Sequence, residues 1–548
     1  QAKIVSAKRI LMVGAPEGYD ARIVERELAR GRPVIHVARD DKRAAAMRAA
    51  LAAMAPEVAV LEFPAWDCLP YDRVSPNPEI SARRMATLAA LADGLAGPFV
   101  LLTTLNAATQ KVPAREVVRA ASFRATVGER VDEARLKVFL ARMGFSPVST
   151  VAEPGDYALR GGIVDIYPPG PGGPIRLDFF GDVLDGARRF DAGSQRTVEK
   201  LKSVDFSAVS EVILDEAAIA RFRQNYRIAF GAAGTDDPLY EAVSAGRKHQ
   251  GMEHWLPFFH ERLETLFDYL PEASVLLDDQ VTPARLARWE GTLDSYDARH
   301  EAMGAKGRID TIYKPVPAEE LYLDDAGWEA ALAATRVVQL SPLAQSPGPG
   351  VLDAGARAGR NFAPERQQEK INLFGALAEH VQVLAKTGQV VIASWSEGAR
   401  ERLKGLLADN GLTGAREIAD FREVPEGRGG LFLVVWPLEA GFVAPGLAVI
   451  SEQDVLGERL TAKPRRKRKA ENFLREVDTL SPGDLVVHVE HGVGRYLGIE
   501  TITALGAPHA CVMLEYAENA KLYLPVENIE LLSRYGHEEG LLDRLGGG

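Results

Sequence analysis

The first residues that could carry chemistry are Gly14 and Gly18, in a short loop between an apolar run and a helix-like stretch. A phosphate-binding loop at such a place needs glycines for close backbone approach, a lysine for the phosphates, and Ser or Thr for magnesium. This loop lacks the lysine and the Ser or Thr, and Glu17 and Asp20 would repel phosphate. The patterns GxxxxGKS and GxxxxGKT occur nowhere in the chain. We therefore expect a degenerate, inactive nucleotide loop and no catalytic residue.

Two other pairs of polar residues could bind a metal ion, but neither pair favours it. Asp278 and Asp279 follow an apolar strand, as acidic magnesium ligands do. Without a phosphate loop to share the metal, a helix cap or a turn is the better interpretation. His488 and His491 lie three residues apart around a strand, so they point to opposite faces. We expect no metal site and no cofactor in this chain.

A different kind of candidate site is formed by Arg160, Arg176 and Phe180. Arg176, Asp178 and Phe180 alternate along one predicted strand, so they share one face of a sheet. Arginine and aromatic side chains are enriched at protein-binding hot spots. The alternative is structural, with Phe180 in the core and Arg176 paired with Asp178. The pattern leaves both interpretations open.

The charge distribution limits where nucleic acid could bind. The net charge of −11 gives no global field that favours nucleic acid. Residues 463–469 carry six positive charges in seven positions and predict either a solvated tether or a contact to DNA phosphates. Residues 480–548 hold four Lys or Arg against ten Asp or Glu, a net charge of −6. A protein partner therefore suits the C-terminal segment better than DNA.

The pattern of strands and helices predicts several domains, as the length of 548 residues requires. Apolar strands alternate with helices in the first part, which favours a parallel sheet covered on both faces. A strand-rich module with Gly/Pro turns interrupts this α/β unit, and a Pro/Gly/Ser linker (341–350) follows it. The C-terminal strands predict a small antiparallel barrel. The expected segments are 1–125 (first part of the α/β domain), 126–204 (inserted α+β domain), 205–340 (second part), 351–458 (small α/β domain), 459–478 (basic tether and helix) and 479–548 (β-barrel).

The composition also indicates a compartment. Two cysteines, Cys68 and Cys511, are too few for a disulfide framework, which favours a reducing environment. No apolar run reaches the roughly 18 to 20 residues that span a bilayer, and the N-terminus lacks a signal-peptide pattern. We expect a cytoplasmic protein without membrane contact.

A set of short motifs connects these segments to a known family. In chain order they are WDCLPYD (66–72), YALRGG (157–162), RLDFF (176–180), FD with SQRT (190–197), ISEQDVLGER (450–459), HVEHGVGRY (488–496) and AKLYLPV (520–526). Together they resemble the N-terminal region of the bacterial transcription-repair coupling factor (Mfd) family. The resemblance runs from about residue 66 to residue 526 in the order of the family.

This resemblance implies a UvrB-like module that has lost its nucleotide site, then a small α/β domain, then a Tudor-like barrel that binds RNA polymerase. It implies that Arg160, Arg176 and Phe180 belong to a UvrA-binding surface. The strand 495–503 would meet the polymerase β subunit by strand addition, with Val486 to Val489 as a further backbone edge. Its expected contact residues are Tyr496, Ile499 and Ile502.

In the family an ATP-driven DNA translocase follows these domains. The resemblance therefore implies that ATP, magnesium and most DNA contacts belong to that motor, and that this chain is an N-terminal fragment without it. The expected function is a scaffold that links stalled RNA polymerase to UvrA and nucleotide excision repair. One alternative is a UvrB-type DNA-dependent ATPase or helicase, although the long aromatic hairpin of UvrB is missing after Tyr71. Another is a transcription regulator of the CarD kind, which would leave the long UvrB-like region without a role.

Overall fold

The first domain is built around a seven-stranded parallel sheet in the order β17-β1-β16-β15-β2-β4-β3. In the computed structural model, the described residues are 8–457, except 96, 232–236, 305–312, 347 and 369–370, together with 483, 485–488, 492–504, 507–517, 520–525 and 532–534. The strands are β1 (Arg9–Val13), β2 (Val34–Ala38), β3 (Val60–Phe63), β4 (Val100–Thr104), β15 (Ser274–Leu277), β16 (Arg336–Leu340) and β17 (Val351–Asp353).

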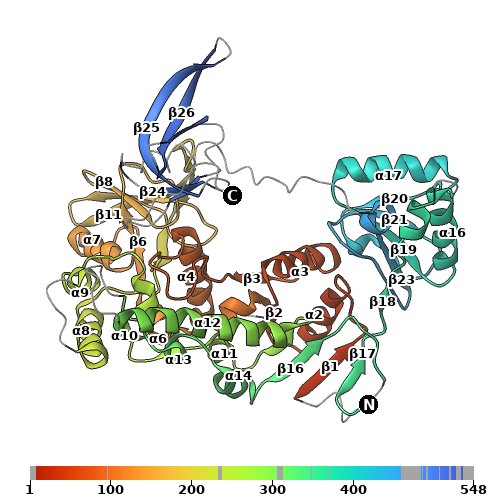
Figure 1. Ribbon diagram of the computed structural model, residues 1–548, viewed down its shortest axis with the longest axis horizontal. Coiled ribbons are helices and arrows are strands. Elements are labelled where there is room, and N and C mark those ends of the chain that lie inside the picture. The colour runs from red at the N-terminus through yellow and green to blue at the C-terminus, as the bar shows by residue number, and fades with distance from the viewer. Residues whose placement is uncertain are drawn as a thin grey trace. The chain divides into compact units, whose positions relative to one another are not determined.

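Helices cover both faces of this sheet, as the apolar strands predict (Figure 1). Side chains of α2 (Asp20–Leu28) and α3 (Asp41–Met54) pack on one face, and those of α4 (Pro78–Asp93) and α14 (Asp325–Leu332) pack on the other. The central strands β2 and β4 are buried along their whole length. The expectation of a parallel sheet covered on both sides is confirmed.

The strand-rich module interrupts this sheet between β4 and β15. It holds a six-stranded sheet in the order β12-β11-β10-β9-β8-β7, and the pair β6–β13 connects it to the first domain. Leu136 and Leu140 of α7 (Glu133–Arg142) pack on the inner face of the sheet. The strands are β6 (Ser122–Thr126), β7 (Ser146–Pro147), β8 (Asp156–Arg160), β9 (Ile163–Ile166), β10 (Ile175–Phe180), β11 (Val183–Phe190), β12 (Thr197–Leu201) and β13 (Ser203–Ser207).

Between the module and β16 the chain is mainly helical. An aromatic core joins α8 (Glu216–Phe230), α9 (Pro238–Ser244) and α10 (Leu256–Phe259) around Phe222, Trp255 and Phe259. The long helix α12 (Val281–Gly304) follows β15. Of the helices in the described residues, none is both long and apolar enough to cross a membrane.

The small α/β domain has its own six-stranded sheet in the order β18-β22-β23-β19-β21-β20. The helices α16 (Leu373–Ala385), α17 (Glu397–Asp409) and α18 (Glu452–Leu456) pack on it. The strands are β18 (Arg357–Ala358), β19 (Gln389–Ser394), β20 (Arg416–Ile418), β21 (Leu431–Val435), β22 (Phe442–Ala444) and β23 (Leu447–Ser451). The start of this domain differs from the sequence expectation, because residues 351–353 form β17 in the first sheet.

The chain divides into two compact units, residues 1–459 and 460–548. In the second unit the described strands form an antiparallel sheet in the order β27-β26-β25-β24-β28. The strands are β24 (Leu485–His488), β25 (Gly492–Ala504), β26 (Ala507–Glu515), β27 (Lys521–Pro525) and β28 (Leu532–Arg534). The basic tether predicted at 463–469 lies outside the described residues.

Candidate protein-binding surfaces

The outer face of the inserted module carries all three residues of the candidate surface. Along β10 the residues at 175 and 177 are buried, whereas Arg176 and Asp178 are half-buried and Phe180 is exposed. This alternation follows the pleat of a strand and places Arg176, Asp178 and Phe180 on the outer face. Arg160 ends β8 at the same end of the sheet as Phe180, because Arg160 and Asp178 are both register partners of Ile163 in β9.

Phe180 is not a core residue. Its exposed fraction of 81% is high for an aromatic side chain, and Leu159, next to Arg160, is 40% exposed. The turns beside them are tight, since Gly162 accepts a hydrogen bond from the Phe179 amide at 2.7 Å. A Cβ at Gly162 would lie 2.8 Å from the Phe179 carbonyl oxygen, so a side chain there would displace the strand that carries Phe180.

The alternative interpretation of the sequence paired Arg176 with Asp178. That pairing is wrong, because Arg176 is bonded to another carboxylate. Its Nε and Nη2 donate to the two oxygens of Asp165 at 2.6 and 2.8 Å, a bidentate ion pair across β9 and β10. The Asp165 carboxylate raises the pKa of Arg176. Asp178 is bonded instead to Arg188 of β11 at 3.0 Å. Arg160 stays exposed and donates to the carbonyl of Ser149.

Side chains of the small α/β domain pack against the degenerate nucleotide loop. Gly14 and Gly18 both have positive φ, at 62° and 94°. A Cβ at Gly18 would lie 2.9 Å from Leu438 and 3.2 Å from Trp436, and both of these side chains belong to the small α/β domain. The Gly18 amide donates to Asp20 at 2.9 Å, so this backbone N–H is already used. The loop therefore serves as a packing surface between two domains.

Next to this loop lies a buried ion cluster, formed by residues that follow the carboxyl ends of β1, β2 and β15. Arg43 is 2% exposed and bonds Asp20 at 2.5 Å and Asp278 at 3.1 Å. Burial raises the pKa of Asp20 to about 6 against the attraction of Arg43, and burial lowers the pKa of His36 to about 4. Asp278, which resembles a magnesium ligand in the sequence, is thus paired with a guanidinium.

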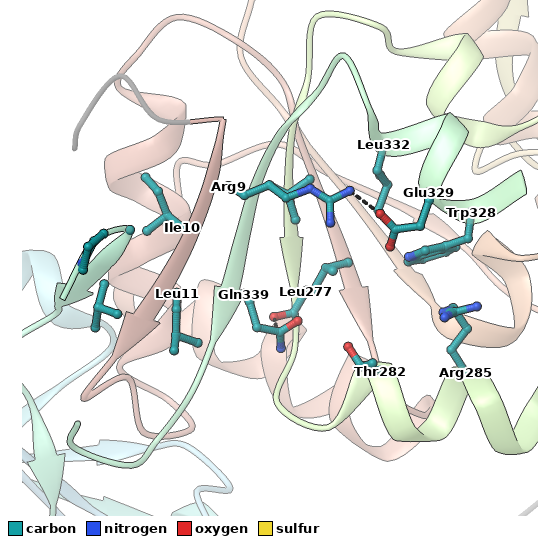
Figure 2. Close-up of a pocket in the computed structure, with 14 residues that line it drawn as sticks. Arg9, Ile10, Leu11, Leu277, Thr282, Arg285, Trp328, Glu329, Leu332 and Gln339 are labelled. Carbon is teal, nitrogen blue, oxygen red and sulfur yellow. Dashed lines mark hydrogen bonds and ion pairs between the residues drawn. The ribbon is translucent and has the colours of Figure 1, made fainter. Parts of the chain in front are cut away.

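A pocket of about 460 Å³ lies beside β1 and β16, between α12 and α14 (Figure 2). Three of the polar side chains that line it already have partners in the chain. Arg9 is paired with Glu329, Arg285 with Asp325, and Gln339 donates to the Asp278 carbonyl at 2.8 Å. We assign no ligand to this pocket.

In the second unit, the expected polymerase-binding strand is β25. Figure 1 shows β25 and β26 as a long two-stranded ribbon. Residues 492–495 of β25 pair with β24, and residues 495–504 pair with β26. Among the described strands, residues 496–504 therefore have a ladder partner on one side only. Residues 486–488 of β24 are paired on both sides, with β25 and β28, so the predicted backbone edge at Val486 to Val489 is wrong for these three residues.

The three residues expected to contact polymerase differ in their surroundings. Tyr496 is 5% exposed and packs in the core of the sheet with Val486 and Leu514, which favours a structural role for its ring. Ile499 and Ile502 stand opposite Val512 and His509 in the β25–β26 register. Their side chains lie outside the described residues, and their role stays a prediction.

Sequence reasoning missed the residues that support these surfaces. Asp165 and Phe190 contact the Arg176 guanidinium. Arg43 bonds Asp20, the residue that ends the nucleotide loop. A signal existed for Asp165, because a charged residue between Val164 and Ile166 in a short apolar strand predicts a paired carboxylate. Its partner depends on strand register, which the sequence does not specify.

Comparisons with known proteins match three separate parts of the chain. The UvrB interaction domain matches residues 123–211, the MFD D3 domain matches 384–455, and the CarD-like/TRCF RID domain matches 480–536. The chain thus combines, in one polypeptide, a UvrB interaction domain with a CarD-like domain.

Curated relatives match nearly the whole chain. The transcription-repair-coupling factor of Escherichia coli K12 is 33% identical over 537 residues, which cover 96% of this chain and 45% of the relative. That of Myxococcus xanthus is 32% identical over 553 residues, and that of Bacillus subtilis is 26% identical over 523 residues. Over most of its length the chain is similar to the N-terminal region of the transcription-repair-coupling factor family. It spans less than half the length of the curated relatives it matches.

Proposed function

We propose that this chain links stalled RNA polymerase to the UvrA protein of nucleotide excision repair. The inserted module would bind UvrA, and β25 would bind the polymerase β subunit by strand addition at residues 496–504. The exposed Phe180 on the same strand face as the ion-paired Arg176 is the observation that carries the proposal, because an aromatic anchor with a fixed arginine is typical of binding hot spots. The match to the UvrB interaction domain supports the choice of partner.

We further propose that the chain itself neither binds nor hydrolyses ATP. The amide of Gly18 is engaged, and the loop that would hold phosphates packs against Trp436 and Leu438. ATP, magnesium and most DNA contacts would belong to the translocase motor of the full-length family protein. The same observations disfavour a UvrB-type ATPase. The match at residues 123–211 disfavours a regulator that uses only a CarD-like domain.

Phe180→Ala tests the UvrA assignment. Phe180 lies outside the core, so the change should leave the melting temperature unaltered and weaken UvrA binding by about 2 kcal/mol, or roughly thirtyfold. Binding to purified UvrA is measured by surface plasmon resonance. Ile228→Ala is the matched control, because Ile228 is 74% exposed on α8, outside the module. Equal UvrA affinity of the Phe180→Ala variant and the unsubstituted chain would contradict the proposal.

A further inference from the structure

The buried carboxylate of Asp165 is the least expected feature of the inserted module. Asp165 lies on β9 and is 1% exposed. A buried carboxylate is costly unless it is paired and fully hydrogen-bonded. Here the partner is Arg176, which stands directly opposite Asp165 in the antiparallel register and bonds it through two parallel N–H groups at 2.6 and 2.8 Å. Such fork geometry fixes the plane of a guanidinium.

A ring supports the same guanidinium from another side. Phe190 at the end of β11 is 3% exposed, and its centroid lies 4.8 Å from Arg176 Cζ. Phe190 packs with Val151 and Ala158 in a small apolar cluster on the outer face of the sheet. The ring is therefore held in place and makes a cation–π contact with the guanidinium.

The neighbouring carboxylate does not compete for Arg176. Asp178 is the next residue on the outer face of β10, and it bonds Arg188 at 3.0 Å. Arg176 thus has one carboxylate partner and one ring partner, and its side chain is 19% exposed. Since Nε and Nη2 are bonded to Asp165, Nη1 is the nitrogen left for an acceptor on another molecule.

We propose that Asp165 and Phe190 are positioning residues of the UvrA-binding surface. They hold the Arg176 guanidinium in one orientation, on the same face of β10 as Phe180 and four residues from it, roughly 13 Å along the strand. A fixed arginine loses little side-chain entropy on binding, so the pair increases affinity without touching the partner. The matching group on the partner is a carboxylate or a backbone carbonyl beside an apolar pocket for Phe180. This inference rests on the proposed binding of UvrA.

A double-mutant cycle on the whole chain tests the inference, with purified UvrA as the probe. Asp165→Asn keeps the shape of the side chain and removes its charge, so we expect about tenfold weaker UvrA binding. In the Arg176→Ala background the same change should alter affinity by less than about twofold, since nothing is left to position. In the Arg160→Ala background, Asp165→Asn should keep its full tenfold effect.

Phe190→Leu is the second variant, because it leaves Asp165 and Arg176 unchanged and keeps an apolar side chain at this position but removes the ring. It should also weaken UvrA binding, and this loss too should vanish in the Arg176→Ala background. An equal loss in the presence and absence of Arg176 would show a general structural role and overturn the inference. So would unchanged affinity of the Asp165→Asn chain. If the unsubstituted chain fails to bind UvrA, the proposed function fails as well.

Discussion

Arg176 shows how a single contact changes the interpretation of a substitution. From the sequence, Arg176→Glu is a simple charge reversal on a surface that leaves the fold intact. In the structure it would put a second carboxylate beside buried Asp165. Loss of UvrA binding in that variant would therefore not identify the contact surface, and Phe180→Ala is the cleaner test.

The first prediction at this scale is that Arg176→Glu lowers the local stability of the module by about 3 kcal/mol, because a buried charge loses its partner. Native-state hydrogen exchange of the β9 and β10 amides measures this local opening. Arg160→Glu is the control, since Arg160 is exposed and bonds a carbonyl and a hydroxyl rather than a carboxylate. Equal protection of the β9 and β10 amides in both variants would show that Asp165 tolerates the loss of its partner.

His254 gives a pH-dependent prediction. It is 1% exposed beside Trp66, and burial lowers its pKa from 6.5 to about 4. Between these values the unfolded chain binds a proton that the folded chain does not, so stability falls as the pH drops from about 6.5 to about 4. The loss from this residue is about 3 kcal/mol. His254→Phe should flatten the pH dependence of the melting temperature in that window. Parallel profiles for the two proteins would exclude the assignment.

At the scale of elements, β25 carries the polymerase prediction. Strand addition tolerates most side-chain changes but not a charge buried in the contact. If Ile502 lies in that contact, Ile502→Arg should weaken binding to the polymerase β subunit by several kcal/mol, more than roughly a hundredfold, with an unchanged melt of the C-terminal unit. Fluorescence anisotropy against the labelled β subunit measures the loss.

Thr501→Arg is the matched control, because successive residues of a strand alternate between faces. Loss of the thermal unfolding transition of the C-terminal unit in the Ile502→Arg protein would instead place Ile502 in the core. Retained binding with an intact fold would refute the assignment of this strand.

The elements also show where sequence reasoning succeeds. Continuous apolar runs such as 100–104 identified the parallel sheet, because strands buried on both faces have no polar alternation. Gly/Pro turns identified the strand-rich module. The return of residues 351–353 to β1 was not predictable, since the Pro/Gly/Ser composition before it is typical of a linker. Strand pairing depends on distant partners rather than on local composition.

The candidate site was predictable to the same degree. Alternation placed Arg176 and Phe180 on one face, and burial in the structure agrees with that face. The pairing of Arg176 with Asp165 rather than Asp178, and the burial of Tyr496, depend on register and on packing between strands. Both are properties of tertiary structure that a single sequence does not display.

At the scale of the whole molecule, we propose that one chain binds UvrA and the polymerase β subunit at the same time. The most direct measurement is retention of UvrA on immobilised polymerase β subunit with and without this chain. We expect UvrA to be retained only when the chain is present, and the Phe180→Ala chain to bind the β subunit normally but to need roughly thirtyfold more UvrA for the same retention. Retention of the unsubstituted chain without UvrA, or competition between UvrA and the β subunit for it, would contradict the account.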